Sequence, residues 1–288
     1  RLHGRCDRVL ADLADPSSLR EAMQGVDVVF HCAGHYPTRR DAPDSTLATG
    51  LRQIDTLCDA AAQADVRRLV YVSSTGTVAP GQGPSTEADT FFERPTQSLY
   101  HALKWEMEAR VLAEDRFETS IACPGACLGP WDLKMGTSAL LVAAARGLDV
   151  PHPDGWIGLV DARDVAEAVV RMAELPEPIS RLLLVGHNRR LQSLLRDLSR
   201  RYGTPSPSAP LTPERAIAFA SAAEAGDTKP AISRAIVDLI VHGVPVDSQR
   251  SRELLGISYR PLASTLDDWG AWAGRLRIIP TEPVRTPA

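Results

Sequence analysis

Several features that would place a sequence in a broad class at once are missing here. Basic residues are not in surplus: 32 lysines and arginines stand against 36 aspartates and glutamates, and the net charge is −4. A nucleic-acid-binding surface needs a basic surplus to neutralise phosphates, so we expect no nucleic-acid partner. The longest uncharged apolar stretch, at residues 139–145, is far shorter than the roughly 20 residues that cross a bilayer. We therefore expect no membrane partner either.

Cysteine is scarce and scattered. The five cysteines are odd in number, which argues against a disulfide framework. Cys123 and Cys127 lie close together, but no histidine or second cysteine pair completes a zinc pattern around them. We interpret both as small buried side chains. We expect no bound metal, reduced thiols and a cytoplasmic protein.

What the sequence does contain is an alternation of short apolar runs with longer amphipathic segments, which is typical of a parallel α/β sheet. With 288 residues, of which 44% are hydrophobic, the chain can bury a sizeable core. The expected strands are residues 26–30, 68–73, 118–122, 156–160 and 181–185, and the expected helices are 47–64, 98–112, 137–146, 163–174, 191–202, 213–225, 231–242 and 262–275.

The composition changes at residues 204–207, where two prolines alternate with threonine and serine, and mostly helical segments follow. We predict an α/β fold with a doubly wound parallel sheet and a smaller, mostly helical C-terminal lobe. The core would take in residues 1–175, of which 126–155 would contribute to a cleft. Residues 176–288 would form most of the lobe and return one strand, 181–185, to the sheet.

Chemistry-bearing residues gather at the expected strand ends, where open α/β sheets bind their ligands. These ends carry His31-Cys32-Ala33-Gly34, Ser73-Ser74-Thr75 and Cys123-Pro124-Gly125. On the expected helix 98–112, Tyr100 and Lys104 lie four residues apart and so share one face. The chain has only three lysines and five tyrosines, so chance explains this pair poorly.

Such a pair suits proton transfer. A phenol with its ordinary pKa of about 10 is a poor base at neutral pH. An ammonium about 4 Å away stabilises a phenolate by up to about 4 kcal/mol at an effective dielectric constant near 20, which lowers a phenol's pKa toward neutrality. The phenol can then exchange a proton with a carbonyl or alcohol oxygen that a serine hydroxyl holds. A hydride carrier is the remaining part, and the expected sheet provides its binding place.

Several short motifs lie at or near these positions along the chain. They are Asp12-Leu13-Ala14-Asp15, His31-Cys32-Ala33-Gly34, Tyr71-Val72-Ser73-Ser74, Tyr100-His101-Ala102-Leu103-Lys104, Cys123-Pro124-Gly125 with Leu128-Gly129-Pro130, Val160-Asp161-Ala162-Arg163-Asp164, and a closing region at 246–248 and 253–256. Together they resemble the extended short-chain dehydrogenase/reductase family, also called the NAD-dependent epimerase/dehydratase family. The resemblance runs from about residue 8 to residue 272 and is specific to the superfamily, not to a substrate.

The resemblance implies a Rossmann-like, dinucleotide-binding core and a substrate lobe, with NAD or NADP as the cofactor and a small-molecule substrate. It implies a homodimer through the helices at 47–64 and 98–112. The implied catalytic residues are Ser74, Tyr100 and Lys104. The implied cofactor-binding residues are Asp12, Leu13, Cys32, Ala33, Gly34, Val72, Ser73, Tyr100, Lys104, Pro124 and Gly125. The implied substrate residues are Thr75, His35, Tyr36 and Trp131.

Two departures from the family pattern stand out. The family opens with a strand and a glycine-rich turn whose backbone cradles the pyrophosphate. No such turn occurs here, and we expect a truncated sequence without roughly fifty or sixty N-terminal residues, which could leave the chain as given inactive. The helix before the serine strand usually carries Asn-x-x-Gly-Thr, whereas Gly50, Gln53 and Ile54 occupy those places here.

The residues after Ser74 bear on the reaction. Sugar-nucleotide dehydratases of the family place Asp-Glu there, and epimerases often place Asn after the proline of the third strand end. Here Thr75-Gly76-Thr77 and Gly125-Ala126 stand instead. The run 74–78 resembles dihydroflavonol-reductase-like, aldehyde-reductase and 3β-hydroxysteroid-dehydrogenase relatives. We therefore favour oxidation or reduction of a carbonyl/alcohol pair on a partly apolar substrate. A sugar or sugar-nucleotide epimerase is the alternative. A non-catalytic, cofactor-binding regulator is the second alternative, which the presence of Tyr100 and Lys104 disfavours.

Other polar residues receive structural interpretations. His31 follows a strand, and we expect it to pack or to bond the backbone. Asp161 and Asp164 have the appearance of a metal or acid/base pair, but we prefer a strand-end turn and a helix N-cap. Asp132, beside Trp131, is a cleft candidate by position alone.

Overall fold

The fold is described here from a computed structural model, in which residues 6–34, 43–133, 135–136, 138–225 and 232–280 are placed. The strands are β1 (Val28–His31), β2 (Arg68–Val72), β3 (Glu118–Pro124), β4 (Ala126–Leu128), β5 (Trp156–Asp161), β6 (Arg181–Leu184) and β7 (His187–Arg190). The helices are α1 (Pro16–Ala22), α2 (Pro43–Gln63), the short 3-10 helix η1 (Thr75–Thr77), α3 (Leu99–Leu112), α4 (Ser138–Ala145), α5 (Ala162–Glu174), α6 (Leu191–Tyr202), α7 (Pro213–Ala225), α8 (Arg234–Val241), α9 (Gln249–Leu255) and α10 (Leu262–Arg275).

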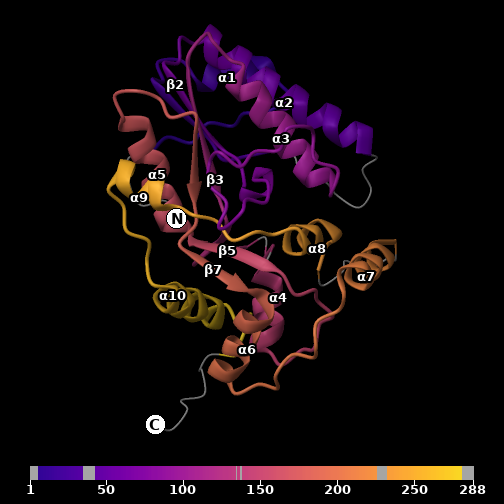
Figure 1. The fold of residues 1–288 in the computed structure, drawn as a ribbon. Helices are drawn as coiled ribbons and strands as arrows, with labels where there is room; N and C mark the ends of the chain where they lie inside the picture. The colour runs from indigo at the N-terminus through magenta and orange to yellow at the C-terminus, as the bar shows by residue number, and fades with distance from the viewer. Residues whose placement is uncertain (1–5, 35–42, 134, 137, 226–231, 281–288) are drawn as a thin grey trace.

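The larger sheet is parallel, with the strand order β1-β2-β3-β6. Its central strands are apolar and buried on both faces, as a parallel sheet covered by helices requires. Alternate residues of β2 therefore enter two different cores. Leu69 and Tyr71 pack with α1, α2 and α3, whereas Val70 packs with α5 and α9. Figure 1 shows these two helical layers on opposite sides of the sheet.

The second sheet has the order β4-β5-β7, in which β5 pairs parallel with β4 and antiparallel with β7. The expected strand at 156–160 thus lies outside the larger sheet. The chain leaves β3 at Gly125, where a Cβ would come within 2.5 Å of the Gly158 carbonyl oxygen, so the two backbones touch. A third core gathers around Trp269, Leu194 and Leu141, and it joins this sheet to α4, α6 and α10.

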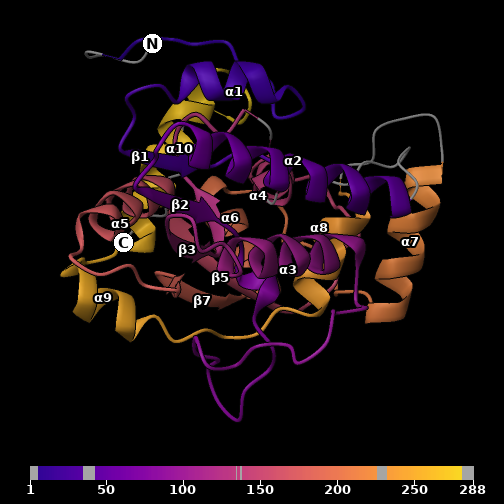
Figure 2. The same cartoon turned by 90° about the horizontal axis from the view of Figure 1, so that it is seen from above.

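Helix α8 packs on β5 main chain against main chain. A Cβ on Gly155 would overlap the Ile240 carbonyl oxygen, and a Cβ on Gly243 would overlap the Trp156 carbonyl oxygen. Only glycine permits this approach. Both views show α8 beside α7 at one edge of the molecule (Figure 1 and Figure 2). The ring of His242, the C-cap residue of α8, meets that of His101 on α3 edge-on, with centroids 6.2 Å apart. None of the helices in the placed part of the chain is both long and apolar enough to span a bilayer.

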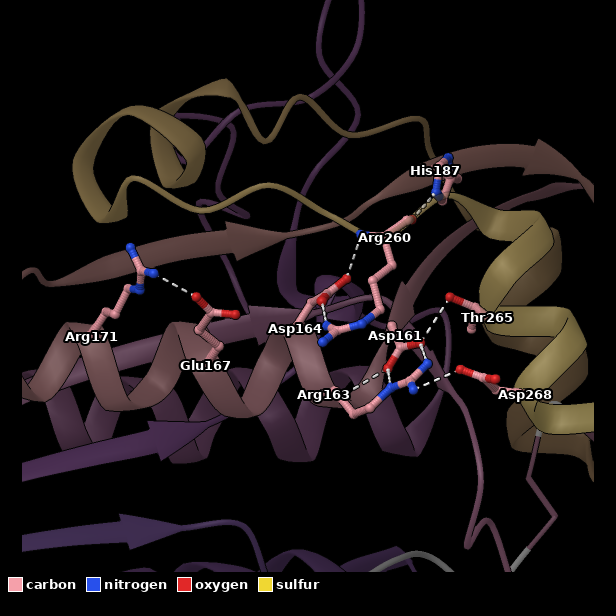
Figure 3. Close-up of polar contacts among 9 residues, drawn as sticks. All are labelled: Asp161, Arg163, Asp164, Glu167, Arg171, His187, Arg260, Thr265 and Asp268. Carbon is pink, nitrogen blue, oxygen red and sulfur yellow. Dashed lines mark hydrogen bonds and ion pairs between the residues drawn. The ribbon is translucent and has the colours of Figure 1, made fainter. Parts of the chain in front are cut away.

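A network of carboxylates and guanidinium groups ties α5 to the C-terminal segment (Figure 3). Asp161 caps α5 by accepting the Arg163 backbone N–H at 2.8 Å, and it accepts the Thr265 hydroxyl of α10 at 2.8 Å. Asp164 accepts the Arg260 backbone N–H at 2.8 Å and also pairs with the Arg260 guanidinium. The N-cap interpretation is therefore confirmed for Asp161. Burial raises the pKa of Asp161, but bonds from Arg163 and Thr265 outweigh it and hold that pKa below its usual value.

Replacing Asp161 with alanine removes the helix cap, leaves the buried Thr265 hydroxyl without this acceptor and leaves Arg163 with Asp268 alone as its carboxylate partner. We expect Asp161→Ala to lower the free energy of unfolding by about 2–4 kcal/mol. The matched control is Glu167→Ala on the same helix. It breaks only an exposed i,i+4 pair with Arg171 and is expected to cost at most about 0.5 kcal/mol. Urea unfolding measures both, and equal midpoints for the two variants would contradict the assignment.

Candidate functional site

A cleft of about 1780 Å³ opens at the carboxyl ends of β1, β2 and β3. Its floor consists of the residues that end these strands, namely Cys32–Gly34, Val72–Thr75 and Pro124–Gly125. Helix α3 forms one wall and α8 contributes another. The cleft lies where open α/β sheets bind ligands, and its volume exceeds the roughly 300–1,000 Å³ of an ordinary small-molecule pocket. It has room for more than one small molecule.

The Tyr100–Lys104 pair lies on the first two turns of α3. Ser98 begins this helix as the N-cap by accepting the His101 backbone N–H, as predicted. Both side chains of the pair line the cleft, and they are buried, at 4% and 5% exposure. The ring of Tyr100 meets that of His101 edge-on, with centroids 6.2 Å apart. The spacing of four residues therefore places phenol and ammonium at one cleft, one helical turn apart.

The ammonium of Lys104 lies against the sheet. Its Nζ donates to Tyr71 Oη at 3.3 Å and lies 5.2 Å from the centre of that ring. Burial lowers the pKa of Lys104, and the nearby Glu108 carboxylate opposes this effect. A charge in such a poorly solvated place acts strongly on neighbouring groups. A buried cation thus lies one helical turn from Tyr100, at the same cleft.

Ser74 lies two residues after β2 and is the N-cap of η1. Its backbone is extended, and its Oγ accepts the Gly76 backbone N–H at 3.1 Å, so the side chain caps the 3-10 helix. This bond uses a lone pair of the hydroxyl and leaves its proton available for donation. Thr75, the next residue, also lines the cleft. The serine is thus held in place by its own turn.

Most of the residues implied by the resemblance line this one cleft. They are Leu13, Cys32, Ala33, Gly34, Val72, Ser73, Ser74, Thr75, Tyr100, Lys104, Pro124 and Gly125. Asp12 is not among the lining residues, and Trp131 points into solvent at 71% exposure. His35 and Tyr36 lie outside the described residues.

Sequence reasoning missed several lining residues. Gln53, Gln97, His101 and His242 all face the cleft. Two of them, Gln53 and Gln97, hold a buried side-chain oxygen without a hydrogen-bond partner in the described part of the chain. For Gln53 the only signal in the sequence was the departure from the family pattern at residues 50–54. The interpretation of Cys127 as buried is wrong, since its side chain is exposed and lines the cleft, whereas Cys123 is fully buried as expected.

The Gly50 departure has a packing consequence. A Cβ on Gly50 would lie 2.5 Å from Leu103 Cδ1 of α3, so a larger side chain would require the fully buried Leu103 side chain to shift. Gly50 therefore lets α2 and α3 approach closely. Gln53, one turn later, supplies the polar group that α2 presents to the cleft.

The residues present fit a nicotinamide dinucleotide. Such a cofactor needs a long cleft, hydrogen-bond donors for ribose hydroxyls and small residues where its backbone passes. Lys104 Nζ offers donors, Gln53 Oε1 offers a free acceptor, and Ala33 and Gly34 leave space at the end of β1. These residues would hold the group beside Tyr100.

Comparison with known proteins agrees with this geometry. A sequence model described as the NAD dependent epimerase/dehydratase family matches residues 2–186. The chain is 28% identical over 211 residues to a Synechocystis sp. protein provisionally named a dihydroflavonol 4-reductase, covering 70% of this chain and 61% of that protein. It is 33% identical over 209 residues to cinnamoyl-CoA reductase 1 of Oryza sativa subsp. japonica, covering 67% of this chain and 60% of that protein.

A third relative is 3beta-hydroxysteroid-dehydrogenase/decarboxylase isoform 1 of Arabidopsis thaliana, 32% identical over 155 residues and covering 50% of this chain and 33% of that protein. The chain spans less than two-thirds of the length of these three relatives. Their names confirm the expected likeness to dihydroflavonol-reductase-like and 3β-hydroxysteroid-dehydrogenase-like proteins.

Solved structures confirm the expected Rossmann-like fold. The crystal structure of gox2253 has a TM-score of 0.79 at 23% identity and covers 96% of this chain and 87% of that one. Yeast methylglyoxal/isovaleraldehyde reductase Gre2, complexed with NADPH, has a TM-score of 0.66 at 18% identity, covering 92% and 83%. The double mutant of DesIV from Streptomyces venezuelae, a dTDP-glucose 4,6-dehydratase with NAD bound, has a TM-score of 0.71 at 18% identity. It covers 93% of this chain and 79% of that one. The expected cofactor, NAD or NADP, agrees with these two complexes.

Two buried histidines predict how stability depends on pH. Burial lowers the pKa of His31 to about 4, assisted by Lys104, and burial lowers that of His101 to about 4, assisted by His242. His31 stacks on Tyr71 at 5.6 Å, and its Nε2 has no hydrogen-bond partner among the placed residues. It packs in the core, as predicted.

In the unfolded chain both histidines take up a proton near pH 6.5, but in the folded chain only near pH 4. Between these values the unfolded state binds more protons, so stability falls as the pH falls. The loss by pH 4 is at most about 3 kcal/mol for each histidine. We expect His31→Gln to flatten this dependence in urea unfolding between pH 7 and 4. His187→Gln, outside the cleft, is the control and should leave it unchanged. Parallel curves for His31→Gln and the parent would refute the assignment.

Proposed function

The chain belongs to the NAD dependent epimerase/dehydratase family, and from that premise we propose that it is an NAD(P)-dependent oxidoreductase. It reduces a carbonyl, or oxidises the corresponding alcohol, on a small and partly apolar substrate. The observation that carries the proposal is that Ser74, Tyr100 and Lys104, from two different elements, line the same cleft. Each of the three supplies a different part of the chemistry.

In the direction of reduction, Tyr100 donates the proton that the carbonyl oxygen needs as it becomes a hydroxyl. Ser74 donates a hydrogen bond to the same oxygen, and its own acceptor lone pair is already taken by the Gly76 N–H. The charge of Lys104 stabilises the phenolate that remains after proton transfer. The dinucleotide, when bound, supplies the hydride for reduction or accepts it in oxidation. Lys104 would also hold the ribose hydroxyls beside the nicotinamide.

The walls of the cleft favour an uncharged, partly apolar substrate. The side of the cleft toward α8 is apolar, with Ile236, Leu239 and Ile240 on that helix. Lys104 is the only cation among the described lining residues, and Asp132 and Glu224 are carboxylates there. The apolar side toward α8 suits a partly apolar carbonyl compound, which supports carbonyl reduction.

Epimerisation is the second candidate function, because it uses the same phenol and the same hydride chemistry. Structures of sugar-nucleotide enzymes are among those with this fold, for example DesIV. Net consumption of reduced cofactor distinguishes the two candidates: a reductase consumes it in proportion to product, whereas an epimerase regenerates it. A non-catalytic regulator would bind the cofactor without turnover.

The central test is Tyr100→Phe in the full-length protein. A screen of carbonyl compounds with NADH and NADPH, followed at 340 nm, first identifies a substrate. Tyr100→Phe should then lower kcat by about a hundredfold or more, because proton transfer alone contributes about 10²–10⁴. Its affinity for the reduced cofactor, measured by fluorescence, should stay within about twofold. Tyr202→Phe, on α6 away from the cleft, is the matched control and should keep its activity. Unchanged turnover in Tyr100→Phe would overturn the role.

Assembly and location stay predictions. A homodimer through α2 and α3 rests on the family resemblance, and light scattering of the purified protein tests it.

A further inference from the structure

A buried ionic cluster lies directly behind the Ser74 turn. It consists of Ser73, Thr77, Glu108, Cys123 and Arg181, none more than 7% exposed, and we refer to it as the Glu108 cluster. Its members come from the residue after β2 and from η1, α3, β3 and β6, so it joins five parts of the chain. Neither the motifs nor the proposed chemistry accounts for a carboxylate and a guanidinium in this place. Ionised groups this deep are costly unless they are paired and bonded.

The carboxylate of Glu108 contacts the serine turn at residues on either side of Ser74. Ser73, immediately before Ser74, donates its hydroxyl to Glu108 Oε1. Thr77, three residues after Ser74, has its hydroxyl 2.6 Å from the same oxygen and 2.9 Å from the Ser74 carbonyl oxygen. One anionic oxygen thus lies within hydrogen-bond distance of hydroxyls at both ends of the turn, and the single Thr77 proton is shared between it and the Ser74 carbonyl oxygen. Hydrogen bonds to a charged acceptor are stronger than those between neutral groups, so these contacts hold the turn in one conformation.

Arg181 balances this carboxylate from the far side. Its side chain reaches from the first residue of β6 to Thr77 Oγ1, at 2.5 Å from Nη2, and its Nε lies 3.5 Å from Glu108 Oε2 and 3.4 Å from Cys123 Sγ. The Thr77 hydroxyl therefore accepts from the guanidinium while it lies within donating distance of the carboxylate. Such an arrangement satisfies both charges in a site that excludes water.

The same carboxylate also faces Lys104, which precedes it by one helical turn. The other titratable groups near Lys104 are Tyr100 on α3, Tyr71 on β2 and Cys123 on β3, together with His31 at the end of β1 and Cys32 just beyond it. Of these groups Glu108 is the carboxylate, and it is the first among those that raise the pKa of Lys104 against the effect of burial.

We infer that Glu108 is a positioning residue, which holds Ser74 in its donating orientation through Ser73 and Thr77 and maintains the charge of Lys104. This inference rests on the proposed function, since it assigns to one carboxylate the placement of two of the three catalytic groups. Glu108 itself touches neither substrate nor reacting atoms. Arg181 supports it by compensating its charge.

The test compares Glu108→Gln with Glu106→Gln in the full-length protein. Glu106 lies on the same helix but pairs at 3.6 Å with Arg94, outside the cluster. Thr77→Val removes the bridging hydroxyl, and Thr77→Ser restores it, so this second pair decides the matter if Glu108→Gln folds poorly. Three quantities are measured: hydrogen exchange of the backbone amides of residues 76–78, the affinity for reduced cofactor, and kcat with its pH dependence.

Exchange at residues 76–78 should become at least about tenfold faster in Glu108→Gln and Thr77→Val, because the bonds that hold the turn are lost. It should be unchanged in Glu106→Gln and largely restored in Thr77→Ser. The kcat should fall about tenfold to a hundredfold, since a small displacement of a catalytic group is costly, while cofactor affinity stays within about twofold. The alkaline limb of kcat should move to lower pH in Glu108→Gln alone, because the ammonium then loses its proton more easily.

Two failures are distinguishable. Unchanged exchange at the turn in Glu108→Gln and Thr77→Val would overturn the inference whether or not a substrate has been found. Equal loss of exchange protection across the whole chain would also overturn it, because the cluster would then be only a support of the core. Failure of the parent protein to reduce any carbonyl compound would overturn the proposed function and leave the exchange test of the turn standing.

Discussion

One buried positive charge determines the character of the cleft. The ammonium of Lys104 lies against the ring of Tyr71 with little solvent around it, and the cleft opens above it at the ends of three parallel strands. A charge in this setting is poorly screened, so its field reaches the phenol one turn away on the same helix. Burial lowers the pKa of the lysine and so works against the charge. The Glu108 carboxylate, one helical turn further along α3, opposes this lowering. The same carboxylate contacts the Ser73 and Thr77 hydroxyls and pairs with Arg181, so much of the buried polar structure behind the site gathers around it.

The sequence predicted the elements whose periodicity is strong. The two strands that support the site, β2 and β3, and the helix α3 with its Ser98 cap were expected within a few residues of their observed bounds. Long amphipathic helices such as α6 and α10 were expected with the bounds that the structure shows. Apolar faces repeated over several turns leave little freedom of assignment. The strand-end motifs then placed the serine and the Tyr–Lys pair at one cleft, because the ends of parallel strands share one edge of a sheet.

Sequence reasoning did not predict the short or polar helices and strands. Helix α1 has seven residues, β4 has three, and β7 is the polar run His187–Arg190, so none carries a detectable apolar pattern. Strand β5 was found, but its partners were not, since strand pairing depends on contacts such as that between Gly125 and Gly158. Cys127 was expected to be buried from its residue type, and its place at the cleft comes from the same crossing. The Glu108 cluster brings together residues up to 108 positions apart, counted from Ser73 to Arg181. Because its members are so distant along the chain, no local sequence pattern predicts it.

The contact between α8 and β5 has a consequence for how this cleft can vary. Gly155 and Gly243 allow the helix and the strand to meet through their peptide groups, without a layer of side chains between them. Of the three side chains that α8 presents to the cleft, Ile240 lies in the third core and Ile236 packs against it, so both also help to seat the helix. Leu239 lines the cleft without belonging to that core. Position 239 is therefore where the chamber can diverge in shape and polarity with the least disturbance of its wall.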